Sequence, residues 1–158
     1  CPRAVEILLR ILLTDSNAYV RKATAWSLGN YADSSVLKPL IHALKNDVAA
    51  VRLWASGSLA EAGSISSDNA IIASTELLIS LQIDSEPSVR SNCIWSLGRL
   101  YQNLDSPRQE EIANAFFNVL LKDEDTSVCY EARTALEQLG NLTVQDRIQS
   151  LMEAGFWV

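Results

Sequence analysis

The fold of this chain is decided by the stretch DSEPSVRSNCIWSLGRL, which runs from Asp84 to Leu100. It reads as a short polar turn, then a proline at a helix start, then an amphipathic helix. Its skeleton is an acidic residue, a Val-Arg pair five residues later, and a Leu-Gly pair that begins eight residues after the valine. The same skeleton recurs along the chain, so the stretch is one unit of a repeat protein.

Aligning the units on their valines gives four copies, at Val20, Val51, Val89 and Val128. The spacings of 31, 38 and 39 residues are typical of helical solenoids. An acid precedes each valine, at Asp15, Asp47, Asp84 and Asp123. An arginine follows the first three valines, at Arg21, Arg52 and Arg90, whereas the fourth copy has Cys129 in that position.

Each valine begins a helix that we name the B helix of its unit, and apolar residues at helical spacing predict an A helix before it. In the third A segment, about residues 69–81, the expected core face consists of Ile71, Ile72, Leu77, Leu78 and Leu81. A fifth segment, residues 143–153, starts with Thr143 as its cap and closes the stack. We therefore expect an all-α, right-handed α–α superhelix of about four helix pairs plus a C-terminal capping helix.

The four units cover about residues 1–32, 33–63, 64–102 and 103–140, and no composition shift divides residues 1–158 into separate domains. The chain starts at Cys1 rather than at a methionine, so we expect it to be a piece of a longer protein. Phe156 and Trp157 follow a helix-stopping glycine. We expect these two aromatic residues to cover the apolar end of the last unit; the alternative is that they continue into a further domain.

Composition excludes several classes of protein. Apolar residues make up 48% of the chain and charged residues 20%, as in ordinary globular domains. A net charge of −6 argues against nucleic-acid binding, which needs a basic surface. No apolar run reaches the ~18 residues of a membrane helix, so we expect no membrane association. Three cysteines without a CxxC pair indicate reduced thiols and a cytoplasmic protein. The oligomeric state stays open.

The pattern of an acid, Val-Arg, small residues and Leu-Gly within helix pairs resembles the HEAT repeat. In that family the acid and the arginine commonly bond from one repeat to the next. The resemblance therefore implies a structural ladder, not a catalytic role, for six residues: Asp15, Arg21, Asp47, Arg52, Asp84 and Arg90. Cys129 departs from the pattern and puts the ladder in doubt at its C-terminal end.

A narrower resemblance rests on two phrases, YVRKATAWSLGN at residues 19–30 and VAAVRLW at residues 48–54. They are similar to cyanobacterial HEAT-repeat proteins of the phycobilin lyase E/F and phycobilisome-degradation type. Those proteins attach bilins to phycobiliproteins, remove them, or act as chaperones for them. This resemblance implies a bilin tetrapyrrole as a ligand.

Helical projection of the B helices places several large side chains opposite the core face, on the side that lines the concave surface of a solenoid. We expect an exposed apolar strip there, made by Trp26, Leu53, Ile94, Trp95 and Tyr130, with Arg99 and Arg133 among the charges around it. Large exposed apolar patches usually mark interaction sites. The alternative is that the rings pack between neighbouring B helices, which is our expectation for Trp54.

No catalytic residue, metal site or resident cofactor is predicted. His42 is the single histidine and has no second histidine or nearby cysteine to share a metal. Cys93 falls on the core face. Cys129 lies at a helix N-terminus, where we expect an inert thiol; the alternative is a thiol with a lowered pKa.

The first functional hypothesis is a non-catalytic module that binds another protein on the concave B-helix face. The second is a phycobilin lyase or lyase-like chaperone. In that case Arg99 and Arg133 are the candidates to pair with the propionates of a bilin.

Overall fold

The computed structural model describes residues 2–157, and within them the chain forms nine α-helices, two short 3₁₀ helices and no strand. The A helices are α1 (Pro2–Thr14), α3 (Leu37–Asn46), α5 (Ser67–Ile83) and α7 (Ser106–Lys122). The B helices are α2 (Ala18–Leu28), α4 (Ala49–Gly63), α6 (Pro87–Leu100) and α8 (Thr126–Gln138). Helix α9 (Leu142–Glu153) follows the fourth pair, and the 3₁₀ helices are η1 (Ser34–Val36) and η2 (Tyr101–Asn103).

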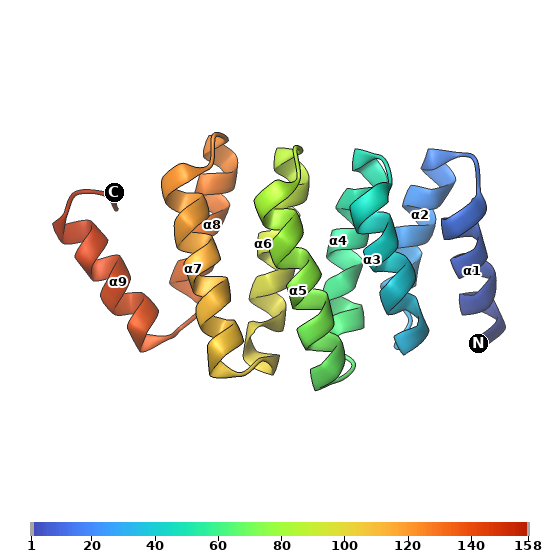
Figure 1. Ribbon diagram of the computed structural model, residues 1–158, viewed down its shortest axis with the longest axis horizontal. Helices are drawn as coiled ribbons and strands as arrows, with labels where there is room; N and C mark the ends of the chain where they lie inside the picture. The colour runs from blue at the N-terminus through green and yellow to red at the C-terminus, as the bar shows by residue number, and fades with distance from the viewer. Residues whose placement is uncertain (1, 158) are drawn as a thin grey trace.

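The four helix pairs stack side by side as an α–α solenoid (Figure 1). In this view α3, α5 and α7 form the near layer and the B helices form the far layer, while α1 and α9 lie at opposite ends. The all-α solenoid expected from the repeat is therefore confirmed.

Polar residues in the turns start most of these helices by accepting hydrogen bonds from free backbone N–H groups. Asn17 accepts from the N–H of Tyr19 at the start of α2, and Asp105 accepts from the N–H of Arg108 at the start of α7. The expectation that Thr143 caps α9 is wrong. Asn141 is the cap, because its Oδ1 accepts from the N–H groups of Thr143 and Val144 at 2.9 and 3.3 Å.

The core lies between the two layers and is filled by the repeated apolar positions. The unit valines Val51, Val89 and Val128 are fully buried, and so are the unit leucines Leu28, Leu59, Leu97 and Leu136. The expected core face of α5 is wrong in part, because Ile71 and Ile72 are each 44% exposed. Helix α5 turns smaller residues inward at these turns, Ala70, Ala73 and Ser74.

A ladder of arginine–aspartate pairs connects consecutive units. The Nε and Nη2 atoms of Arg21 donate to the two carboxylate oxygens of Asp47 at 3.0 and 2.8 Å. Arg52 binds Asp84 in the same way at 2.9 and 3.0 Å, and Arg90 binds Asp123 at 2.9 Å in both bonds. All six side chains are largely buried, and two parallel N–H···O bonds make each pair strong and directional.

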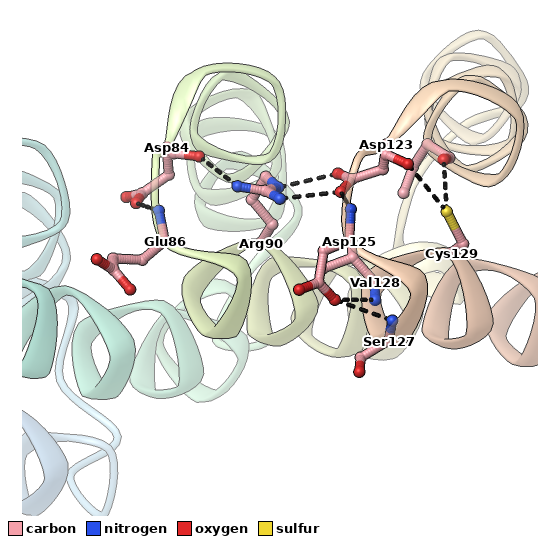
Figure 2. Close-up of polar contacts among 9 residues, drawn as sticks. Asp84, Glu86, Arg90, Asp123, Asp125, Ser127, Val128 and Cys129 are labelled. Carbon is pink, nitrogen blue, oxygen red and sulfur yellow. Dashed lines mark hydrogen bonds and ion pairs between the residues drawn. The ribbon is translucent and has the colours of Figure 1, made fainter.

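The third nitrogen of each ladder arginine holds the turn of its own unit. Nη1 of Arg90 donates to the backbone carbonyl of Asp84 at 2.9 Å, so that one guanidinium bridges two turns (Figure 2). Arg21 and Arg52 make the same bond to Asp15 and Asp47. Each guanidinium therefore fixes both the turn in its own unit and the position of the next unit.

The ladder ends at Cys129, which takes the arginine position in α8. Its Sγ lies 3.3 Å from the carbonyl oxygen of Asp123 and 3.6 Å from that of Val119 (Figure 2). The thiol thus takes over the bond that a ladder arginine makes to the turn of its own unit. It has no further donor for a carboxylate of a following unit. Burial, with the charges of Asp123 and Asp125, raises the pKa of the Cys129 thiol, so the alternative of a lowered pKa is wrong.

Beyond the ladder, α9 and the C-terminal aromatics cover the end of the solenoid unequally. Trp157 is buried with the core, and the guanidinium of Arg133 lies 5.3 Å from its ring. Phe156 is 68% exposed. Covering of the last unit therefore rests on Trp157 and not on both aromatics.

Gly63 and Gly98 both lie in the last turns of B helices, but the space around them differs. A Cβ on Gly63 would lie 2.9 Å from both Ala73 Cβ and Leu100 Cδ2, whereas a Cβ on Gly98 would meet nothing within 4 Å. We expect Gly63→Ala to lower the free energy of unfolding by about 1–3 kcal/mol through overpacking. Gly98→Ala should raise it by about 0.5–1 kcal/mol, because alanine is the better helix former. Urea unfolding of both variants checks this, and equal effects would contradict it.

The ladder also predicts an acid-dependent stability. Burial raises the pKa of Asp47, but hydrogen bonds from Arg21 and from the Val48 N–H outweigh it, and the net pKa lies below the usual value. Asp123 is lowered in the same way by Arg90 and the Asp125 N–H. Because a lowered folded-state pKa stabilises the fold above the unfolded value, this stability is lost as the pH falls below about 4.

We therefore expect the double variant Asp47→Asn/Asp123→Asn to be less stable at pH 7 and to depend less on pH between about 4 and 2 than the parent. Urea unfolding across this range measures it. An acid dependence as steep in the variant as in the parent would show that other carboxylates cause it.

Candidate functional site

A groove of about 930 Å³ runs over the B-helix layer, and we name it the B-face groove. Its floor comes from α4, its sides from α2 and α6, and one end from α8. The lining residues are Trp26, Gly29, Asn30, Trp54, Gly57, Ser58, Glu61, Ser88, Ser91, Asn92, Trp95 and Glu131.

Small residues bring the B helices together beneath the groove. The hydroxyl of Ser58 in α4 donates to the carbonyl of Ala25 in α2 at 2.6 Å. On the other side, the hydroxyl of Ser96 in α6 donates to the carbonyl of Ser56 at 2.6 Å. Gly29 is required for this approach, because a Cβ there would lie 2.8 Å from Ser58 Oγ. The groove floor is therefore mostly backbone and small side chains.

Two exposed tryptophans stand on either side of this floor. Trp26 in α2 is 56% exposed and Trp95 in α6 is 50% exposed. They occupy the same position of their units, six residues after the unit valine, and Gly57 occupies that position in α4 between them. A Cβ on Gly57 would lie 3.1 Å from Nδ2 of Asn92, so the glycine lets this side chain of α6 approach α4 closely.

A third indole forms part of the groove wall. Trp54 in α4 is half-buried and packs its ring at 82° to that of Trp26, with 6.5 Å between the ring centroids. Lys22 Nζ lies 6.0 Å from the Trp54 ring. Trp54 therefore combines the expected packing between helices with a place in the groove lining.

The charges that line the groove are both carboxylates, Glu61 and Glu131. Glu61 binds Arg99 at 2.6 Å, and the guanidinium of Arg99 lies 5.1 Å from the Trp95 ring. The guanidinium of Arg99 thus lies between an indole ring and a carboxylate. The electron-rich face of the ring and the negative charge of the carboxylate both attract it. No basic residue belongs to the lining among the residues that the structure describes.

The structure separates the side chains that the helical projection grouped together. Trp26 and Trp95 are exposed in the groove, but the expectation that Ile94 is exposed beside them is wrong, because Ile94 is 1% exposed. The equivalent Ala25 is fully buried as well. The residues at this position of the unit are therefore buried and do not belong to the groove lining.

The other expected partner-binding residues lie outside the groove lining. Leu53 is half-buried and packs against the core, and Tyr130 is 65% exposed on α8. Arg133 binds Glu137 at 3.3 Å and stacks on Trp157. Conversely, the projection did not assign Gly57 or Glu131 to the site; their equivalence in the repeat to Trp26 and Trp54 is the signal that could have found them.

Other reactive side chains stay apart from the groove. Burial raises the pKa of the Cys93 thiol strongly. His42 lies within hydrogen-bond distance of the Asn46 side chain, 3.3 Å away. Across residues 2–157 no group of three histidine, cysteine or acidic side chains is placed to hold a metal ion, and no helix is long and apolar enough to span a bilayer.

Comparison with solved structures finds similar solenoids that were made in the laboratory. An engineered protein from the Northeast Structural Genomics Consortium is 22% identical, with a TM-score of 0.62 over 96% of this chain and 69% of its own. A designed armadillo repeat protein in complex with the peptide (KR)4 is also 22% identical, with a TM-score of 0.62 over 97% of this chain and 71% of its own. A second engineered protein from the same consortium is 20% identical, with a TM-score of 0.53 over 96% of this chain and 85% of its own. At these identities the likeness shows the fold.

Comparison with curated protein sequences gives no significant match. The phycobilin-lyase resemblance has no support among these comparisons. A family model described as HEAT repeats matches residues 5–75, and one described as HEAT repeat matches residues 75–104. Together with the ladder and the stacked helix pairs, these matches support the HEAT-repeat family for this chain.

Proposed function

We propose that the B-face groove binds an extended segment of a partner protein that carries basic side chains. The observation that supports this most directly is the pair of half-exposed indoles, Trp26 and Trp95, on either side of a floor made mostly of backbone and small side chains. Tryptophan is the side chain most enriched among binding hot spots, and an exposed indole loses unfavourable contact with water when a partner covers it.

The chemistry of the lining favours a basic segment over an acidic one. Its charged residues, Glu61 and Glu131, are acidic, and the chain as a whole carries a net charge of −6. Glu61 already pairs with Arg99, which also stacks on Trp95, so Glu131 is the lining carboxylate that attracts an arginine or lysine of the partner. The exposed ring of Trp26 offers a face on which such a cation can stack.

The architecture suits an extended ligand, because solenoids present long surfaces built from equivalent positions of successive units. The designed armadillo repeat protein of similar fold is in complex with the peptide (KR)4. That peptide is therefore the natural probe for this groove.

We expect fluorescently labelled (KR)4 peptide to bind, and a matched (DE)4 peptide not to bind, in fluorescence anisotropy at low ionic strength. Trp26→Ala and Trp95→Ala should each weaken (KR)4 binding by about tenfold or more, which corresponds to about 1.4 kcal/mol. Phe156→Ala, which removes an exposed aromatic outside the groove, is the matched control and should change nothing.

The same titrations separate this groove from general attraction between opposite charges. Suppose that added salt weakens (KR)4 binding equally in all variants and that the two tryptophan variants bind (KR)4 as tightly as the parent. The binding would then be diffuse charge attraction, which would contradict the proposal. Loss of binding in Phe156→Ala to the same extent would do so as well.

A stability control shows that the tryptophan variants report on binding and not on folding. Trp95→Ala removes a half-exposed ring and should change the free energy of unfolding by less than about 1 kcal/mol. Ile94→Ala, one residue earlier but fully buried, should lower it by about 2–4 kcal/mol. Urea unfolding measures both.

A further inference from the structure

One of the two exposed indoles of the B-face groove already has a cation of this chain beside it. The guanidinium carbon of Arg99 lies 5.1 Å from the centroid of the Trp95 ring, within the range of a cation–ring contact. Nη1 of the same side chain lies 2.6 Å from Oε1 of Glu61 in α4. Trp95 and Glu61 both line the groove, so Arg99 occupies a position at which two lining residues attract a cation.

The repeat shows that this arrangement is particular to one of the two groove tryptophans. Arg99 follows its unit valine by ten residues, and Glu61 holds the same position in the preceding unit. In the first unit this position is Asn30, four residues after Trp26. Among residues 2–157 no lysine or arginine lies over the Trp26 ring. Trp26 therefore offers an open ring, whereas Trp95 shares its ring with Arg99.

Arg99 is held less firmly than the arginines of the ladder. The side chains of Arg99 and Glu61 are 46% and 45% exposed, whereas those of Arg90 and Asp123 are largely buried. An exposed ion pair contributes little to stability, because water and salt screen it. The fold therefore depends little on the contact between Arg99 and Glu61, and another guanidinium can replace Arg99 there at small cost.

A segment that follows the whole groove must pass over this contact. The B helices are stacked in the order α2, α4, α6, α8 (Figure 1). Trp26 lies in α2 and Glu131 in α8, while Glu61 and Trp95 lie in the two helices between them. A basic segment that reaches from Trp26 to Glu131 therefore meets Arg99, whose like charge repels the cations of the segment unless the side chain moves away.

We propose that Trp95 and Glu61 form a guanidinium-binding subsite of the B-face groove, which Arg99 occupies in the free protein and which an arginine of a bound segment enters by displacing Arg99. This inference rests on the proposed function and names the residue type that the groove takes at this place. The exchange keeps one ion pair and one ring contact, and the displaced side chain regains rotamer freedom. The subsite selects arginine over lysine, because a planar guanidinium stacks on an indole while its edge pairs with a carboxylate.

The variant Arg99→Gln empties the subsite and tests the proposal directly. We expect it to bind (KR)4 about three- to tenfold more tightly than the parent in fluorescence anisotropy, because the peptide no longer competes with Arg99. Arg10→Gln is the matched control, since it changes the net charge equally and Arg10 is exposed on α1, outside the groove lining. Equal tightening in both variants would show diffuse charge attraction and would overturn the proposal.

Double variants locate the gain at the subsite. Trp95→Ala or Glu61→Gln, added to Arg99→Gln, should each remove the gain, so that Trp95→Ala costs more affinity in this background than in the parent. Glu110→Gln, which removes an exposed acid of α7 outside the groove lining, should leave the gain in place. A gain that survives Glu61→Gln would contradict the proposal. Far-UV circular dichroism checks that every variant keeps its helices.

The selectivity of the subsite is measured with two simpler peptides, octaarginine and octalysine. The step from the parent to Arg99→Gln should increase the affinity for octaarginine at least about threefold more than the affinity for octalysine, because only the guanidinium both stacks and pairs. Equal gains for the two peptides would show that the emptied position is not a guanidinium site.

The outcomes separate this inference from the proposed function. If the parent binds (KR)4 and Arg99→Gln binds it no more tightly than Arg10→Gln does, the subsite is wrong while the proposed function stands. If Arg99→Gln binds the peptide and the parent does not, Arg99 closes the groove to basic segments, so the proposed function fails while the subsite stands. Absence of binding in both proteins would overturn both.

Discussion

The structure depends on a guanidinium that binds three oxygens from two different turns. In each rung, Nη1 holds the backbone carbonyl of the arginine's own unit, while Nε and Nη2 hold the carboxylate of the next unit. The planar fork of arginine fits this task, whereas a lysine ammonium would act as a point charge without a fixed direction. Because both groups are largely buried, removing one partner would leave the other charged and unsolvated.

This constraint has a consequence for the surface on the other side of the B helices. Each rung sets how far one unit is shifted along the next, so that equivalent positions of α2, α4 and α6 lie in rows. Trp26, Gly57 and Trp95 form one such row, in which the glycine lies between two indoles and against the side chain of Asn92. The ladder residues do not belong to the lining of the B-face groove, which is the surface that we propose for binding.

Some predictions from the sequence failed because they left out the contacts between units. Helical projection treats each helix as isolated, so it gave Ile94 and Trp95 the same side. In the solenoid, Ser58 and Ser96 pull α4 against its neighbours through hydrogen bonds to backbone carbonyls. The resulting close approach buries Ile94 and leaves Trp95 exposed. For Cys129 only the alternative of a lowered pKa failed, because burial and two nearby acids raise the pKa of the thiol despite its place at a helix N-terminus.

The sequence by itself determined the repeat, the helix pairs and the identity of the ladder residues, because periodic apolar positions and recurrent turn residues act locally and are readable from spacing. The tertiary structure alone decided which of the large side chains opposite the core face are buried, so that Ile94 is buried and Trp95 is exposed. It also decided that Trp26, Trp54 and Trp95 line one groove. These properties depend on the distance between neighbouring helices. No local pattern of the sequence encodes that distance.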